Sequence, residues 1–234
     1  MNEIFEREIN LIGEEAFEKL QNSRVAVFGL GGVGSYAAEA LVRCGVGSLE
    51  LIDGDVVSVT NINRQLCALT STVGRPKAEV VAERARDINP QAKITARVEF
   101  FLPDTEQNFD FSSYDFVIDA IDSVAGKLSI AKKAAEAGVP MISCMGTGNK
   151  LDPTAFKVTD ISKTTVCPLA RVMRRELKKI GISHLKVIYS EELPKKPETA
   201  EGSRPVPSSI AFVPSVAGLI AAREAVAVLS LLEK

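Results

Sequence analysis

The chain has 234 residues, which is enough for one large domain or for one domain with an appendage. Apolar residues make up 46% of the chain and charged residues 25%, as in an ordinary globular protein, which argues against extensive disorder. The net charge of -2 excludes an overall polycation, so binding to a nucleic acid would need a local basic patch.

The sequence predicts neither an export signal nor a membrane span. Residues 1–7 are polar and hold no apolar signal core, so secretion is not expected. The most apolar stretch, residues 210–232, is interrupted by Pro214, Arg223 and Glu224. We therefore expect a cytoplasmic protein whose last helix is buried or faces a dimer partner.

Cysteine and histidine content limits the metal chemistry. The four cysteines form no C-x-x-C pair, so a structural zinc site is not supported. His184 is the single histidine, which excludes a multi-histidine metal centre. Cys167 precedes a charged segment, where a thiolate role would need a lowered pKa; an incidental small side chain is the more common explanation.

Strands and helices alternate through the first two thirds of the chain. An amphipathic helix is expected first, at residues 5–21. Short apolar runs predict strands at residues 24–28, 48–52, 93–100, 115–118 and 139–144. Helical spacing predicts helices at residues 33–44, 77–88 and 125–137. This alternation predicts an α/β fold with a Rossmann-like, mostly parallel sheet and flanking helices.

The pattern changes after residue 148. Strands are expected at residues 155–158 and 186–189, on either side of a charged helix at 168–180. Residues 191–209 are rich in Pro, Lys, Glu and Ser and predict a mobile loop. We therefore divide the chain into a nucleotide-binding domain at residues 1–150 and a small α+β extension at 151–234, packed on the same domain.

Residues 29–34 read GLGGVG and lie between a predicted strand and a predicted helix, the context in which a G-x-G-x-x-G pattern indicates phosphate binding. Gly29 permits a tight turn, Gly31 and its neighbour Gly32 let backbone amides approach a phosphate, and Gly34 allows close packing of helix on strand. Asp53 ends the second strand, where an acid suits a ribose hydroxyl pair. NAD and ATP fit these features equally well.

A polar cluster after Asp53 favours ATP over NAD, because a dehydrogenase needs little beyond the acid here. Amides in the cluster can hold a nucleotide by neutral hydrogen bonds, and the cations can offset charge on phosphate oxygens. Its members are Asp55, Asn61, Asn63, Arg64, Gln65 and Lys77.

Two carboxylates, Asp119 and Asp122, follow the fourth predicted strand in the run V-I-D-A-I-D-S. Ligands bind at this end of parallel sheets, and one or two carboxylates together with nucleotide phosphates suit Mg²⁺. Asp122 also fits a helix N-cap, and both roles are compatible.

Taken in order, GLGGVG, D-G-D-x-V, N-x-N-R-Q, G-R-P-K and D-A-I-D resemble the ubiquitin-activating-type (ThiF, MoeB and HesA) adenylating superfamily over about residues 24–150. The resemblance implies ATP bound with Mg²⁺ and attack of a substrate oxygen on the α-phosphate. By position, Asp53 would hold the ribose, Arg64 and Lys77 the phosphates, and Asp122, with Asp119, the metal. It also implies a homodimer in which Arg7 reaches the partner's ATP; an exposed helix arginine is the alternative.

Within this superfamily the chain is most similar to tRNA threonylcarbamoyladenosine dehydratases, in segments that include E-R-E-I-N-L-I-G-E-E-A and S-S-I-A-F-V-P-S-V-A-G. This resemblance implies ATP-dependent closure of a hydantoin ring through an adenylated carboxylate. The implied partners are tRNA, through its anticodon stem-loop, and a cysteine desulfurase for sulfur transfer. The alternative is adenylation of the C-terminal Gly-Gly of a ubiquitin-like sulfur carrier, which the missing C-x-x-C pairs disfavour.

A basic stripe offers a candidate tRNA surface. Arg171, Arg174 or Arg175, and Lys178 have the spacing of one helical face, with Lys179 next to them. Such a stripe can follow phosphates, but a plain solvated face produces the same pattern, and nearby glutamates dilute the charge.

Overall fold

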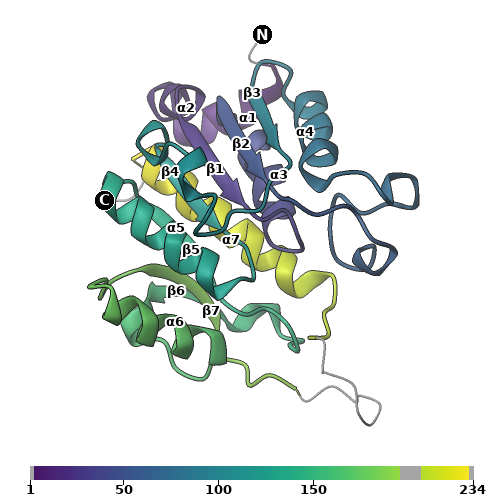
Figure 1. The fold of residues 1–234 in the computed structure, drawn as a ribbon. Coiled ribbons are helices and arrows are strands. Elements are labelled where there is room, and N and C mark those ends of the chain that lie inside the picture. The colour runs from purple at the N-terminus through teal and green to yellow at the C-terminus, as the bar shows by residue number, and fades with distance from the viewer. Residues whose placement is uncertain (1–2, 196–206, 232–234) are drawn as a thin grey trace.

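The fold is built on one seven-stranded sheet in the order β3-β2-β1-β4-β5-β7-β6 (Figure 1). The computed structural model describes residues 3–195 and 207–231. Its strands are β1 (Arg24–Phe28), β2 (Ser48–Ile52), β3 (Lys93–Arg97), β4 (Phe116–Asp119), β5 (Met141–Cys144), β6 (Phe156–Asp160) and β7 (Lys186–Ser190). Neighbouring strands are parallel except β6 and β7. The predicted α/β fold with a mostly parallel sheet is confirmed.

Helices cover both faces of this sheet. They are α1 (Glu6–Ile12), α2 (Glu14–Gln21), α3 (Gly34–Arg43), α4 (Lys77–Ile88), α5 (Val124–Ala137), α6 (Pro168–Lys179) and α7 (Phe212–Leu229). The main core packs residues of α3, α4 and α7 against one face, and α5 and α6 pack on the other. Both faces of the central strands are therefore buried.

The sequence of β1 shows why this layering forms. Its residues are apolar after Arg24, and alternate side chains point to opposite faces of the sheet. Val25 and Val27 join the core under α3 and α7, whereas Ala26 and Phe28 join an aromatic cluster under α5. A strand buried on both sides needs such a continuous apolar run.

Two predicted elements differ from the structure by more than two residues, and the other bounds agree to within two. The helix expected at residues 5–21 is two helices, because Gly13, with a φ of 87°, ends α1 and begins α2. The strand expected at residues 93–100 ends at Arg97, which pairs with Ile52, the last residue of β2. Beyond that point no neighbouring strand is present to continue the ladder.

The last helix, α7, is a core helix of this fold. Its length and hydropathy would suffice for a membrane span, but more than half of it is buried in the molecule. It packs on α3, where a Cβ on Gly218 would lie 2.2 Å from the carbonyl oxygen of Val33. Its buried Glu224 pairs with Lys186 at 3.0 Å. The expectation of a buried helix in place of a membrane span fits this packing.

The loop predicted at residues 191–209 lies partly outside the described residues, which omit 196–206. Its described ends meet at Asn149, a residue with a φ of 61°. The Asn149 carbonyl accepts from the Lys195 amide at 2.8 Å, and its Oδ1 accepts from the Ser208 amide at 2.7 Å. β7 pairs with β5, so the part after residue 150 adds strands to the same sheet; the two-part division stays a prediction.

Candidate nucleotide-binding site

A cavity of about 730 Å³ opens at the carboxyl ends of β1, β2 and β4. β1 lies between β2 and β4 in the sheet, so the strand order reverses there, and open α/β sheets bind ligands at such a point. The volume lies within the range of sites for small molecules. Ten predicted site residues line it: Gly29, Gly31, Gly32, Asp53, Asp55, Asn61, Arg64, Gln65, Lys77 and Asp122.

The glycines of the turn between β1 and α3 have two different roles, packing of the turn and space for a ligand. Gly29 has a φ of 86°, and a Cβ on Gly34 would lie 1.7 Å from the Gly29 carbonyl oxygen, so both positions are fixed by the fold. A Cβ on Gly31 would meet only Gln65 Nε2, at 3.6 Å. Gly34 serves the packing of the turn and is not among the residues that line the cavity, whereas Gly31 leaves room for a phosphate at the start of α3.

Gly31→Ala tests this division. The added methyl makes an ordinary contact in the free protein but occupies the space before the turn, so we expect ATP affinity to fall at least about 10-fold while the melting temperature stays within about 2 °C. Isothermal titration and thermal melting measure the two effects. Gly34→Ala is the matched contrast: it should fail to fold. Unchanged ATP affinity in the folded Gly31→Ala protein would contradict phosphate binding at this turn.

Asp53, at the end of β2, connects the second strand to the glycine turn. Its Oδ2 accepts from the Leu30 amide at 2.7 Å and its Oδ1 from the Asp55 amide at 2.8 Å. Burial raises the pKa of Asp53, and these backbone hydrogen bonds oppose the rise. Each oxygen keeps a further lone pair, so the carboxylate can accept from a ribose hydroxyl while it holds the turn.

Two cations face the cavity in fixed positions. Lys77, the first residue of α4, is buried and its Nζ lies 2.9 Å from Asp55 Oδ2. Arg64 Nη1 donates to the Thr60 carbonyl at 3.0 Å and to Asn63 Oδ1 at 2.9 Å. Both side chains are oriented before any ligand binds, which is the arrangement that favours stabilisation of phosphate charge.

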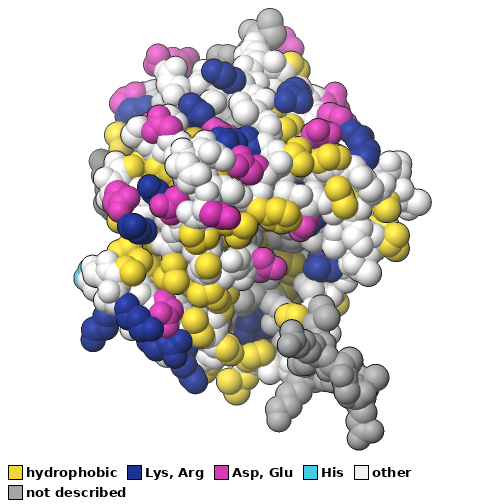
Figure 2. All heavy atoms as spheres, in the orientation of Figure 1, with side chains coloured by type: hydrophobic (Ala, Val, Ile, Leu, Met, Phe, Trp, Pro, Cys, Tyr) yellow, Lys and Arg dark blue, Asp and Glu magenta, His cyan; other side chains and the backbone are white. Residues whose placement is uncertain are grey.

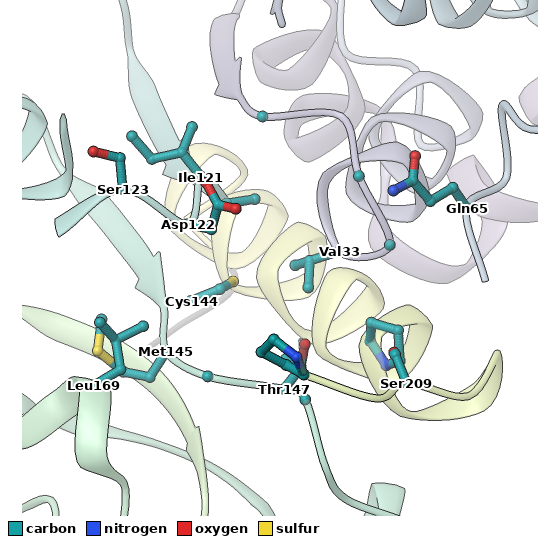
Figure 3. A pocket seen from close by; sticks show the side chains of 18 of the residues that line it. Val33, Gln65, Ile121, Asp122, Ser123, Cys144, Met145, Thr147, Leu169 and Ser209 are labelled. Atoms are coloured by element: carbon teal, nitrogen blue, oxygen red, sulfur yellow. The ribbon is translucent and has the colours of Figure 1, made fainter. Parts of the chain in front are cut away.

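Gln65 and Asp122 extend into the cavity from different sides (Figure 3). Among the described residues Gln65 Oε1 is buried and has no hydrogen-bond partner. A buried acceptor left unpaired is costly, so a donor from a ligand would complete it. Asp122 is exposed to the cavity and its carboxylate forms no ion pair within the described residues. The cavity lining therefore includes the Gln65 side chain, whose buried Oε1 is unsatisfied, and the free carboxylate of Asp122.

The structure corrects the prediction that Asp119 is a second metal ligand. Asp119 is fully buried outside the cavity, and both of its oxygens contact Lys127 Nζ, at 3.0 and 3.1 Å. Ser143 Oγ also donates to it, at 2.5 Å. The spacing D-x-x-D suggested a joint site, but Asp119 is the last residue of β4 and turns into the core, whereas Asp122 follows in the loop.

Arg7 and Asn63 lie outside the cavity lining, whereas Asn61 belongs to it. Arg7 is exposed on α1 and does not reach the cavity of its own chain. Asn63 does not line the cavity; its Nδ2 donates to the Ser209 carbonyl at 3.0 Å. Asn61 lines it, although its Oδ1 accepts from the Ser58 amide at 3.0 Å.

Sequence reasoning missed Lys127 and Lys150. Lys127 forms the buried ion pair with Asp119 described above, and Lys150 is a buried amine in the cavity wall. Neither belongs to a motif, and their partners lie in other parts of the fold. Cys167, whose role the sequence left undecided, is also buried in this wall at the start of α6.

The fold and the site define a nucleotide-binding α/β protein with the fixed cations and free carboxylate of an adenylating enzyme. The chain belongs to the ThiF family, whose model matches residues 5–234. It is 47% identical over 230 residues to a Bacillus subtilis tRNA threonylcarbamoyladenosine dehydratase, covering 92% of this chain and 90% of that protein.

Solved structures agree with this assignment. The E. coli tRNA N6-threonylcarbamoyladenosine dehydratase TcdA, solved with AMP and with ATP, superposes with a TM-score of 0.91 at 36% identity, over 99% of this chain and 95% of that one.

A sequence relative from another branch matches less of the chain. E. coli molybdopterin-synthase adenylyltransferase is 38% identical over 141 residues, but over only 60% of this chain and 55% of that protein. The resemblance read from the motifs is confirmed.

Proposed function

We propose that this protein is a cytoplasmic enzyme that uses ATP to dehydrate tRNA threonylcarbamoyladenosine to its cyclic hydantoin form. The observation that carries the proposal is the 47% identity, over nearly the whole length of both chains, to a dehydratase of that name. The TM-score of 0.91 to TcdA solved with ATP supports it. Detection of AMP and pyrophosphate release that depends on tRNA carrying the linear nucleoside tests it.

In this proposal the nucleotide occupies the part of the cavity formed by the glycine turn and the ends of β1 and β2. Amides of the turn bind phosphate oxygens, and Asp53 accepts from the ribose. Arg64 and Lys77 stabilise the negative charge that grows at the α-phosphate and on the departing pyrophosphate. Asn61 and Gln65 add neutral hydrogen bonds, and the unpaired Gln65 Oε1 supports that role.

Asp122 fits a role as the protein ligand of Mg²⁺. Mg²⁺ in such enzymes is held by one or two carboxylates together with phosphates, and Asp122 is a free carboxylate on the cavity. No cluster of three acidic, His or Cys side chains occurs in the described ranges, so the substrate's own phosphates would supply further ligands. The ion would neutralise charge between the phosphates and the carboxylate.

The chemistry follows from bringing two anions together. A carboxylate oxygen of the threonylcarbamoyl group attacks the α-phosphorus, and pyrophosphate leaves. A nitrogen of the same side chain then attacks the activated carbonyl carbon, releasing AMP and one proton and closing the ring. The oxygen lost from the nucleoside departs in AMP, and ring closure is fast because the nucleophile is tethered. Adenylation of a sulfur carrier is not proposed, since the molybdopterin-synthase relative matches a smaller part of the chain.

Helix α6 is our proposed docking surface for the tRNA. Figure 2 shows Lys and Arg side chains gathered at the lower left, over α6. The helix starts in the cavity wall at Pro168, and Arg171, Arg175, Lys178 and Lys179 are exposed on it. The backbone phosphates of a tRNA would bind favourably to such a basic surface next to the cavity.

Hydrogen bonds and ion pairs within the protein occupy part of the predicted basic stripe and leave two of its residues available for phosphates. The Arg174 side chain is partly buried and donates to the Thr164 carbonyl at 2.9 Å. Arg175 and Lys179 both form ion pairs with Glu176. Arg171 and Lys178 have no carboxylate partner within the described part of the chain and are the stronger candidates.

Charge reversal tests this surface. Arg171→Glu combined with Lys178→Glu should lower tRNA affinity about 10- to 100-fold and flatten its salt dependence, with ATP affinity unchanged. Fluorescence anisotropy over a salt series measures both quantities. Lys93→Glu combined with Lys132→Glu, two exposed lysines that are not on α6 and do not line the cavity, is the matched control. Equal tRNA binding by the two double variants would contradict docking on α6.

We further propose a homodimer in which the exposed Arg7 of each chain completes the partner's site. Its exposure on α1 and its absence from its own cavity support this proposal. If Arg7→Ala remains dimeric in sedimentation and fully active, this role is wrong. A cysteine desulfurase as sulfur-transfer partner, implied by the resemblance, is testable by co-purification.

A further inference from the structure

The cavity has a second wall, made by the later part of the chain. We name it the C-terminal wall: residues 144–150 and 167–169 with Pro194, Pro207, Ser209 and Pro214. Several of its side chains, including Met145, Thr147 and Leu169, are visible in Figure 3. Apart from Lys150, every residue of this wall is apolar or neutral. Its single charge therefore marks the place where an anion would be recognised.

Lys150 is buried without a matching carboxylate. The residue is 4% exposed, and its ammonium donates to the backbone carbonyl of Glu192. The Glu192 carboxylate instead accepts from the backbone amides of Leu151, at 2.9 and 3.0 Å, and of Asp152, at 2.9 Å. No ion pair within 4.0 Å involves Lys150 in the described ranges, and at least one of its three N–H donors remains available.

This arrangement is costly in the free protein. Burial lowers the pKa of Lys150, opposed by the nearby Cys167 and Glu192. A buried ammonium without a carboxylate costs free energy that a neutral side chain of similar size would not. A ligand anion in the cavity would remove that cost, so the lysine fits a binding role better than a structural one.

We infer that Lys150 binds the carboxylate of the substrate's threonylcarbamoyl side chain, an inference that rests on the proposed function. The nucleotide's phosphates have Arg64, Lys77 and the glycine turn, which come from the first half of the chain and line the same cavity as Lys150. Adenylation requires a second anion next to the α-phosphate, and a cation on the C-terminal wall offsets the repulsion between them.

The test compares Lys150→Met with the wild-type protein. We expect kcat/KM for tRNA carrying linear threonylcarbamoyladenosine to fall about 10- to 100-fold, because a charged hydrogen bond is lost. ATP affinity should stay within about twofold, and the melting temperature should stay level or rise, since a buried charge is removed. Lys157→Met, an exposed lysine of β6 paired with Glu191, is the control and should match the wild type.

The outcomes separate the inference from the proposed function. If the wild type converts the tRNA and Lys150→Met does so within threefold, the inference is wrong and the proposed function stands. A parallel loss of ATP affinity or of melting temperature would also overturn it, because it would indicate a nucleotide-binding or structural role. If the wild type leaves the nucleoside unchanged, the proposed function fails and the inference fails with it.

Discussion

Asp122→Ala is expected to lower the rate of pyrophosphate formation at least about 100-fold while the fold remains intact. The carboxylate faces the cavity, and within the described residues it makes no hydrogen bond or ion pair that the fold would lose. Without this carboxylate, the Mg²⁺ would lose its proposed protein ligand. The negative charges of the attacking carboxylate and the α-phosphate would then be less well neutralised. A coupled pyrophosphate assay with saturating ATP and substrate tRNA measures the rate.

Asp104→Ala is the matched control, because Asp104 is exposed and lies outside the cavity lining. It should retain the wild-type rate and melting temperature. Asp122→Ala should share that melting temperature, which separates a lost ligand from a lost fold. If Asp122→Ala forms pyrophosphate at the wild-type rate, Asp122 does not belong to the reacting centre.

Lys127→Met is expected to lower the free energy of unfolding by about 3–5 kcal/mol, because it leaves a buried carboxylate without its cation. Lys127 Nζ contacts both oxygens of Asp119 and donates to the Cys144 carbonyl at 2.7 Å. These bonds join α5 to the ends of β4 and β5, beside the loop that holds Asp122. For a chain of this length the melting temperature should fall on the order of 10 °C.

A double variant shows whether the loss of stability comes from an unpaired buried charge or from altered packing. Lys127→Met combined with Asp119→Leu removes both buried charges and should recover most of the lost stability. Thermal melting and urea unfolding measure the recovery. A single Lys127→Met protein that melts within 2 °C of the wild type would contradict a structural role for this pair.

The elements that the sequence predicted best are those whose boundaries are set locally. Arg24–Phe28, Ser48–Ile52 and Lys77–Ile88 have the predicted bounds, since apolar runs and the Asn89-Pro90 stop act within a few residues. The glycine turn was equally readable, because a tight turn between strand and helix needs its glycines whatever lies around it.

The failures involve partners that lie in other elements of the fold. The end of β3 depends on where β2 ends, and the burial of Asp119 depends on Lys127 and Ser143 in other elements. Lys150 reads as an ordinary surface lysine until the fold brings it into the cavity wall. Gly13 is the exception, because a glycine that ends a helix is a local signal in the sequence, and the helical periodicity of residues 5–21 concealed it.

Mass spectrometry of nucleosides tests the proposed dehydratase function most directly. Bulk tRNA carrying linear threonylcarbamoyladenosine is incubated with the protein and Mg-ATP, and its nucleosides are then released under mild conditions. The proposed dehydratase function predicts that this nucleoside loses one water only when ATP is present. An unchanged nucleoside, from a protein that binds ATP, would contradict the dehydratase function and direct attention to carrier proteins ending in Gly-Gly.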